Sequence, residues 1–193
     1  EVDHSQAWKR ADRSGQSALF LDDAAGLTEA AATKRDSIQR RLDHARSIID
    51  SEPLGKHWLV WHDLEAERHA IEKAMPLAKT VYGSQDLDER EDLIVGFSQG
   101  DYRILATKPS LAGSGCNFQK HCADAIFLGV GYKFNDFIQA IHRIYRFGQT
   151  RTVNIHILYL DSESSIKDAL ETKWRQHDAL VALAETLGTA PQI

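Results

Sequence analysis

The chain has 193 residues, 42% of them hydrophobic, which is enough to bury one substantial core. Its formal net charge is -5, so no global basic field points to a free-standing nucleic-acid-binding protein. That charge counts less against a domain that touches one strand through backbone amides and a few side chains.

The first part of the chain changes character near residue 29. Residues 1–28 are polar and mixed, and we expect a linker or the tail of a preceding region. From Glu29 the pattern turns helical, because apolar residues recur at steps of three and four: Ile38, Leu42, Ala45 and Ile49. Pro53 and Gly55 are predicted to end this helix.

An alternation of strands and helices follows. Strands are predicted at 57–62, 79–82, 102–107, 123–130 and 153–160, and helices at 64–74, 86–97, 135–145 and 163–187. Nearly continuous apolar runs such as AIFLGV indicate a mostly parallel sheet that is buried on both faces. Because ligands gather at the carboxyl ends of such strands, we expect chemistry in the loops after Thr107 and Val130, and in the helix that follows.

The most informative stretch is QAIHRIYRFGQT, residues 139–150. Gln139, Arg143 and Arg146 follow steps of four and three, which places them on one helical face, and Gly148 is predicted to end the helix. Two guanidinium groups on one face suit a cluster of anionic oxygens, because their planar forks match phosphate. The alternative on spacing alone is a solvated basic face that forms salt bridges with neighbouring acids.

This stretch closely resembles motif VI of superfamily-two helicases, in the form seen in Swi/Snf-type remodelling ATPases. The glutamine, the two arginines and the Gly-Gln pair of that motif are matched by Gln139, Arg143, Arg146, Gly148 and Gln149. The resemblance implies that Arg146 is the leading arginine finger and Arg143 its partner. Both would reach ATP and Mg²⁺ held mainly by a first RecA-like domain, and Gln139 and Gln149 would also bind ATP.

A second stretch, ATKPSLAGSGCNF, residues 106–118, resembles motif V of the same family. Small residues after a strand let backbone amides approach a phosphate, although a glycine-rich loop alone is weak evidence. The resemblance implies nucleic-acid contacts at Thr107 and Lys108 and ATP contacts at Gly115 and Asn117. Gly113 occupies a further matching position.

Weaker matches come in the family's order. The stretch HWLVWH resembles motif IV, and Gly83 and Ser84 follow the next strand, where the resemblance implies contact with the nucleic-acid backbone. The implied organisation is a second RecA-like domain at 29–162 and a C-terminal bracing helix at 163–193. The stretch GVGYKFND replaces the family's Asp and Trp-Asn-Pro, which makes the chain more similar to helicases of bacterial and phage defence or restriction systems.

We therefore expect the second motor domain of an ATP-dependent helicase or translocase, working on DNA, with RNA as the alternative track. One rival is a degenerate motor fold that binds DNA or a protein without hydrolysis. Another is a methyltransferase, which would need a Pro-Pro pair that the chain lacks. The nine histidines form no pattern of metal ligands, so no metal site is predicted.

The remaining expectations concern location and completeness. Cys116 and Cys122 form no metal-ligand pattern, and two unpaired thiols suit a reducing cytoplasm. The resemblance to bacterial and phage helicases implies a prokaryotic or phage origin. No run approaches a membrane span of about 20 apolar residues, so no membrane partner is expected. The chain begins at Glu1 and its one methionine is Met75, so we expect a piece of a longer protein.

Overall fold

The computed structural model describes residues 37–111, 116–128, 134–160 and 163–188. These residues belong to a compact unit that begins at Ser37. The predicted linker at 1–28 and the first part of the helix predicted from Glu29 lie outside the described residues.

Five strands form one sheet in the order β2-β3-β1-β4-β5, and all four pairings between them are parallel. The strands are β1 (His57–Trp61), β2 (Lys79–Val81), β3 (Ile104–Thr107), β4 (Cys122–Phe127) and β5 (Asn154–Ile157). Each falls inside or within one residue of a predicted strand, so the predicted parallel sheet is confirmed. Three central strands, β1, β3 and β4, carry the long apolar runs that the prediction used.

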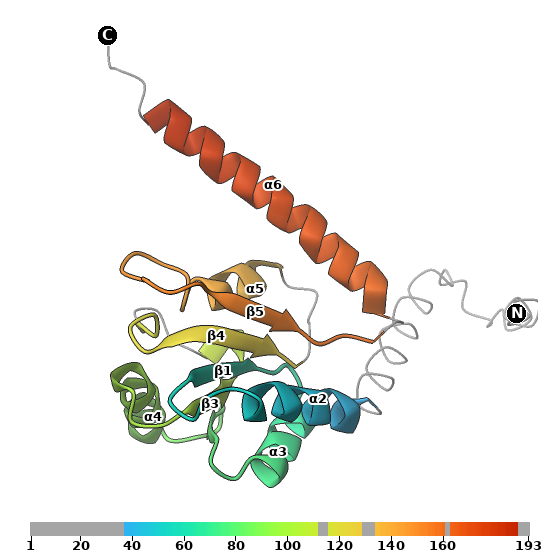
Figure 1. Cartoon of the computed structure of the whole chain (residues 1–193), viewed down its shortest axis with the longest axis vertical. Helices are drawn as coiled ribbons and strands as arrows, with labels where there is room; N and C mark the ends of the chain where they lie inside the picture. The colour runs from blue at the N-terminus through green and yellow to red at the C-terminus, as the bar shows by residue number, and fades with distance from the viewer. Residues whose placement is uncertain (1–36, 112–115, 129–133, 161–162, 189–193) are drawn as a thin grey trace, which may run out of the picture. The chain divides into compact units, whose positions relative to one another are not determined.

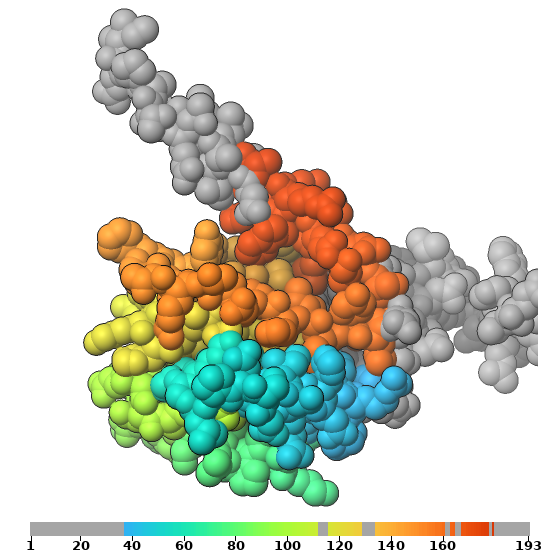
Figure 2. Space-filling view, viewed as in Figure 1, coloured from blue at the N-terminus to red at the C-terminus, as the bar shows by residue number. Residues whose placement is uncertain are grey.

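Helices cover both faces of the sheet (Figure 1). On one face lie α2 (Ile38–Asp50) and α3 (Glu65–Ala74), and on the other lie α4 (Leu87–Gln99), α5 (Phe134–Ile141) and α6 (Ser164–Gly188). Figure 2 shows α2, in blue, at the surface of the domain. The central strand β1 serves both cores, because Trp58 and Val60 point to one side and Leu59 and Trp61 to the other.

The apolar face predicted for α2 is buried, since Ile38, Leu42, Ala45 and Ile49 are all in the core. Trp58 and Trp61 are fully buried, so both pack in the core and neither is a surface platform for bases. Asp86 caps α4 by accepting hydrogen bonds from two backbone amides of its first turn. A short 3₁₀ turn, η2 (Pro109–Leu111), was not predicted.

One ion pair is buried between the two helices of the α2/α3 face. An Arg41 Nη atom lies 3.2 Å from a carboxylate oxygen of Glu67, and the two side chains are 4% and 0% exposed. The other oxygen of Glu67 accepts hydrogen bonds from the backbone amides of Asp63 and Leu64, at 2.8 and 3.0 Å. A second Nη atom of Arg41 donates to the carbonyl oxygen of Leu128, just beyond β4. The pair therefore connects both helices to the sheet.

Candidate functional site

The helix that carries the predicted arginines is shorter than expected. Regular α-helix ends at Ile141, and the amides of Arg143 and Ile144 then bond to carbonyls three residues back. The helix predicted to continue to about Tyr145 is thus replaced by a tight turn, and the helical face expected for Gln139 and both arginines is interrupted. Gly148 has φ +89, the left-handed conformation expected of a terminating glycine.

We define residues 142–149 as the arginine turn, and side chains fix its backbone. The Gln149 amide donates to the carbonyl oxygens of Cys122 and Ile144, at 3.1 Å each. From the facing loop, Gln119 donates to the carbonyl oxygen of Phe147 at 3.3 Å. Arg151, directly after the turn, donates to the carbonyl oxygens of Gln119 and His121. The turn therefore has a fixed position against the loop that precedes β4.

The two predicted arginine fingers differ in their exposure to solvent. Arg146 is exposed, whereas Arg143 is half-buried and its Nε is buried without a hydrogen-bond acceptor in the part of the chain that the structure describes. Among the residues that the structure describes, no carboxylate lies within ion-pair distance of either guanidinium. Burial raises the pKa of the Cys116 thiol, and the charge of Arg143 opposes that rise. The arrangement leaves two guanidinium groups able to bind an anion.

The other predicted ATP-binding residues belong to different elements of the chain. Gln139 is exposed on α5, and Asn117 is exposed in the loop before β4. Gln149 is half-buried, and its amide is engaged in holding the turn. Gly115 lies outside the described residues. A contact of any of these four with ATP stays a prediction.

The predicted nucleic-acid contacts gather at the carboxyl ends of β2 and β3. Gly83 and Ser84 are exposed between β2 and α4, and a Cβ at Gly83 would meet nothing within 4 Å. Lys108 follows β3 and pairs with Glu65 at 3.1 Å. Thr107 is fully buried, and its hydroxyl donates to the carbonyl oxygen of Val81. The Thr107 side chain therefore joins β3 to β2, while the other three residues remain accessible.

A charged network on α3 supports this carboxyl edge. Arg68 pairs with Glu65 at 2.8 Å and with Glu72 at 2.6 Å. Its guanidinium also lies 4.2 Å from the ring centre of Tyr82, the residue before Gly83. Helix α3 thereby contacts the loops that follow both β2 and β3. Glu65 and Arg68 were not among the predicted site residues, although their spacing of three residues on a predicted helix indicates an ion pair.

The two groups of candidate residues lie at opposite edges of the sheet. Gly83, Ser84 and Lys108 follow the carboxyl ends of their strands, whereas the arginine turn is bonded to Cys122, the first residue of β4. In Figure 1 the strand arrows point toward the right, and the chain between α5 and β5 turns at the left. Helix α5 therefore starts at the carboxyl edge and carries the arginines back to the amino edge.

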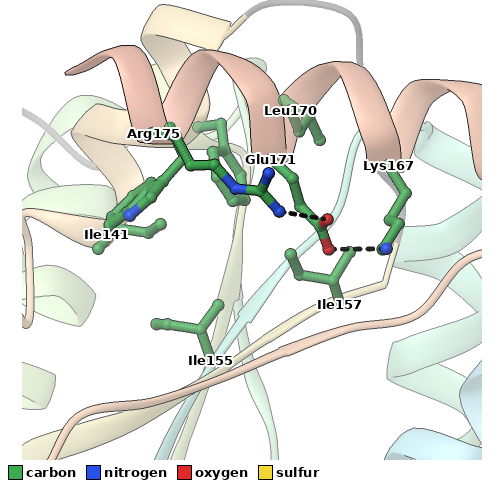
Figure 3. A pocket seen from close by; sticks show the side chains of 9 residues that line it. Ile141, Ile155, Ile157, Lys167, Leu170, Glu171 and Arg175 are labelled. Atoms are coloured by element: carbon green, nitrogen blue, oxygen red, sulfur yellow. Dashed lines mark ion pairs between the residues drawn. The ribbon is translucent and has the colours of Figure 1, made fainter. Parts of the chain in front are cut away.

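A separate cavity of about 390 Å³ lies between α5, β5 and α6. Apolar side chains line most of it, among them Ile155 and Ile157 of β5 and Leu170 of α6 (Figure 3). The ion-paired side chains Lys167, Glu171 and Arg175 project from α6 at its rim. No residue expected to bind ATP or nucleic acid lines this cavity.

His62, at the carboxyl end of β1, is 1% exposed, and neither ring nitrogen has a hydrogen-bond partner among the described residues. Burial lowers the pKa of His62 to about 4. The charges of Glu67 and Glu65 act against that fall, and the charge of Lys108 adds to it. The imidazole is therefore neutral at neutral pH.

Acid should destabilise the chain through His62. The folded pKa of about 4 lies below the ordinary value of 6.5, so the unfolded chain binds the extra proton as pH falls from 6.5 toward 4. Between pH 7.5 and 5.0 the wild-type chain should lose about 2 kcal/mol of unfolding free energy that a His62→Gln variant does not lose. Urea unfolding of both proteins at the two pH values measures the difference, and identical losses would contradict it.

The described residues contain neither a cluster of metal-ligating side chains nor a membrane-spanning helix. No group of three or more His, Cys, Asp or Glu side chains in the described ranges could hold a metal ion. Cys116 and Cys122 are both free. None of the described helices has the length and apolar character needed to cross a membrane.

Comparison with solved structures places the fold. The C-terminal part of the Fun30 ATPase domain is similar with a TM-score of 0.55 and 21% identity, over 66% of this chain and 44% of that chain. The C-terminal domain of the DEAD-box protein Dbp5 gives 0.59 and 16%, over 69% and 78%. A longer S. cerevisiae Dbp5 chain, bound to Gle1 and IP6, gives 0.61 and 15%, over 71% and 37%.

This chain thus spans less than half of the Fun30 fragment and of the longer Dbp5 chain. No protein-family model matches its sequence, and neither does any curated protein. At these identities the likeness concerns the fold, and it agrees with the predicted parallel sheet flanked by helices. The chain has a RecA-like α/β fold, similar to that of the C-terminal parts of Fun30 and Dbp5.

Proposed function

We propose that the chain is the second motor domain of an ATP-dependent nucleic-acid translocase or helicase of the Swi/Snf-like kind found in bacteria and phages. The domain spans 29–162, with 163–193 as a bracing helix, and DNA is the proposed track. A first RecA-like domain of the same polypeptide holds ATP and Mg²⁺. Arg143 and Arg146 are the arginine fingers, and the accessible residues Gly83, Ser84 and Lys108 meet the nucleic-acid backbone.

The observation that carries this proposal is that neither arginine forms an ion pair with any described residue. A basic face built for stability would be expected to show ion pairs, as Arg68 does with Glu65 and Glu72. Arg143 instead keeps a buried Nε–H that has no acceptor among the described residues, which is costly unless an acceptor arrives from outside. A phosphate oxygen delivered by another domain supplies such an acceptor.

In this mechanism ATP, when bound, provides the phosphoryl group that is transferred to water. The guanidinium groups of Arg143 and Arg146 donate N–H bonds to its phosphate oxygens and stabilise the charge that develops during transfer. The fixed backbone of the arginine turn holds the fingers in place beforehand, so little reorganisation is needed at the moment of reaction. Nucleic acid binds at the opposite edge, where the carboxyl ends of β2 and β3 lie.

The chain alone is expected not to hydrolyse ATP, because its sequence contains no Gly-Lys-Ser/Thr loop to cradle the β- and γ-phosphates. Phosphate release by the purified 193-residue chain should stay at background with and without nucleic acid. Steady release that a point change within the chain abolishes would contradict the half-motor proposal.

Lys108 tests the proposed nucleic-acid edge. In the full-length protein, Lys108→Ala should reduce the slope of log affinity against log salt concentration by about 0.7 to 0.9, the loss of one phosphate contact. Fluorescence anisotropy with labelled single- and double-stranded DNA at several salt concentrations measures the slope.

Lys167→Ala is the matched control for that experiment. Lys167 is 31% exposed and pairs with Glu171 at 2.7 Å, much as Lys108 is 28% exposed and pairs with Glu65 at 3.1 Å. Its slope should equal the wild-type slope, since α6 is not a proposed nucleic-acid contact. Equal slopes in all three proteins would remove Lys108 from the nucleic-acid site.

A further inference from the structure

The arginine turn displays two aromatic rings to solvent. Phe147 is 100% exposed and Tyr145 is 57% exposed, and they stand on either side of Arg146 in the chain. Transfer of a phenyl ring from water into an apolar environment is favourable, so a ring wholly in water gains by meeting another surface. A single exposed ring is common on proteins, and a docking role needs further support.

The first support is the rigidity of the backbone that presents Phe147. Its carbonyl oxygen accepts a hydrogen bond from Gln119, and the next two residues are fixed by the positive φ of Gly148 and the two hydrogen bonds of Gln149. The exposure of the ring is thus a property of an anchored turn. A ring carried on a fixed backbone docks at a smaller cost in conformational entropy than a ring on a mobile loop.

The second support is charge. The segments 116–123 and 137–160 contain no Asp or Glu, in a chain whose formal net charge is -5. They contribute Lys120, Arg143, Arg146 and Arg151, which all lie in or next to the arginine turn and its facing loop. Whatever covers the rings must therefore combine an apolar patch with anionic groups.

We infer that Phe147, with Tyr145 beside it, is a docking contact for the first motor domain, made when that domain brings ATP to Arg146. This inference rests on the proposed function. Consecutive Cα atoms are about 3.8 Å apart, so a surface that delivers a phosphate to Arg146 also comes close to Phe147. The phosphates supply the anionic groups, and the docking surface supplies an apolar socket.

Stacking of a nucleic-acid base on Phe147 is the competing use of a ring surrounded by cations. The structure favours the domain contact, because the accessible residues expected to meet nucleic acid are at the opposite edge of the sheet. Gly83, Ser84 and Lys108 follow the carboxyl ends of β2 and β3, and the arginine turn is bonded to the first residue of β4.

Site-specific photo-cross-linking tests the inference in the full-length protein. A benzoyl-phenylalanine placed at position 147 is irradiated without nucleotide, with a non-hydrolysable ATP analogue, and with labelled single-stranded DNA. Mass spectrometry then identifies the partners. We expect cross-links to peptides upstream of Glu1 that increase several-fold with the analogue. The control probe stands at Leu77, an apolar residue that is 86% exposed between α3 and β2, and it should show no increase.

Two outcomes of the cross-linking would overturn the inference. One is cross-linking of position 147 to the DNA in place of upstream peptides. The other is a yield on upstream peptides that is the same with and without the analogue, or absent in both conditions. The proposed function is tested separately, by the ATP turnover of an Arg146→Ala protein. Wild-type turnover there would show that Arg146 is not a finger, whatever peptides position 147 cross-links to.

Kinetics provide a second readout. Phe147→Ala should raise the KM for ATP several-fold while keeping most of kcat, because docking stabilises the closed state before transfer. Arg146→Ala should lower kcat instead. A Phe147→Ala protein with wild-type KM would overturn the inference, whereas rescue of KM by Phe147→Leu would support an apolar contact.

Discussion

Replacement of Arg146 by alanine in the full-length protein should reduce nucleic-acid-stimulated ATP turnover by about 10³ to 10⁵-fold, with little change in ATP affinity. A finger contacts charge that builds up mainly in the transition state, so its loss appears in kcat. Arg146→Lys should restore little, since an ammonium group lacks the planar fork. Steady-state ATPase assays and ATP-analogue binding measure the two quantities.

The partner residue and a control sharpen that experiment. Arg143→Ala should behave similarly, and the double variant should lose less than the sum of the two losses, because both groups serve one phosphate cluster. Arg175, which is 80% exposed on α6 beside Glu171, is the matched surface arginine, and Arg175→Ala should turn over like the wild type. Normal turnover in folded Arg143 and Arg146 variants would leave the rival interpretation, a motor fold that only binds.

Removal of the Glu67 carboxylate should cause the largest loss of stability. Glu67→Ala removes the carboxylate that lies 3.2 Å from the Arg41 guanidinium, a group that is 4% exposed and keeps its hydrogen bonds to Ser37 and Leu128. It also releases the amides of Asp63 and Leu64 at the start of α3. Breaking such a buried pair costs about 3 to 5 kcal/mol of unfolding free energy. Urea unfolding followed by circular dichroism measures it.

Two further variants separate the effect of the Glu67 charge from the effect of its hydrogen bonds to the amides at the start of α3. Glu67→Gln keeps an acceptor for the two amides but removes the negative charge, so a large part of the loss should persist. Glu72→Ala removes a carboxylate of the same helix that is 36% exposed and pairs with Arg68, and it should cost less than about 1 kcal/mol. Equal losses for Glu67→Ala and Glu72→Ala would contradict the importance of burial.

Most of the fold could be predicted because its elements carry local signals. Continuous apolar runs, apolar residues at steps of three and four, and helix-ending prolines and glycines located five strands and the helices around them. The end of α5 could not be predicted, because Gln119 and Gln149 hold the arginine turn through bonds that span 28 and 27 residues. Periodicity within a helix contains no information about such partners.

The candidate site, too, was predictable only where the signal is local in the sequence. The sequence pointed to Arg143 and Arg146 through the motif that they match, but it could not show that no carboxylate among the described residues pairs with them. It placed Thr107 on the nucleic acid, whereas the hydroxyl donates to Val81, 26 residues earlier in the chain. The exposure of Phe147 could not be predicted, because the sequence alone does not distinguish an exposed aromatic ring from a buried one.

The opposite placement of the two edges has a mechanical consequence. Strand β4 spans the distance between the two edges and is six residues, or about 20 Å, long. It packs against a hydrophobic core on each face, so we expect the sheet to rotate as a rigid unit. In the proposed motor, a rigid-body rotation of about 15° would displace the far end of that strand by about 5 Å. A change in the ATP cleft at one edge would therefore be transmitted to nucleic acid at the other edge.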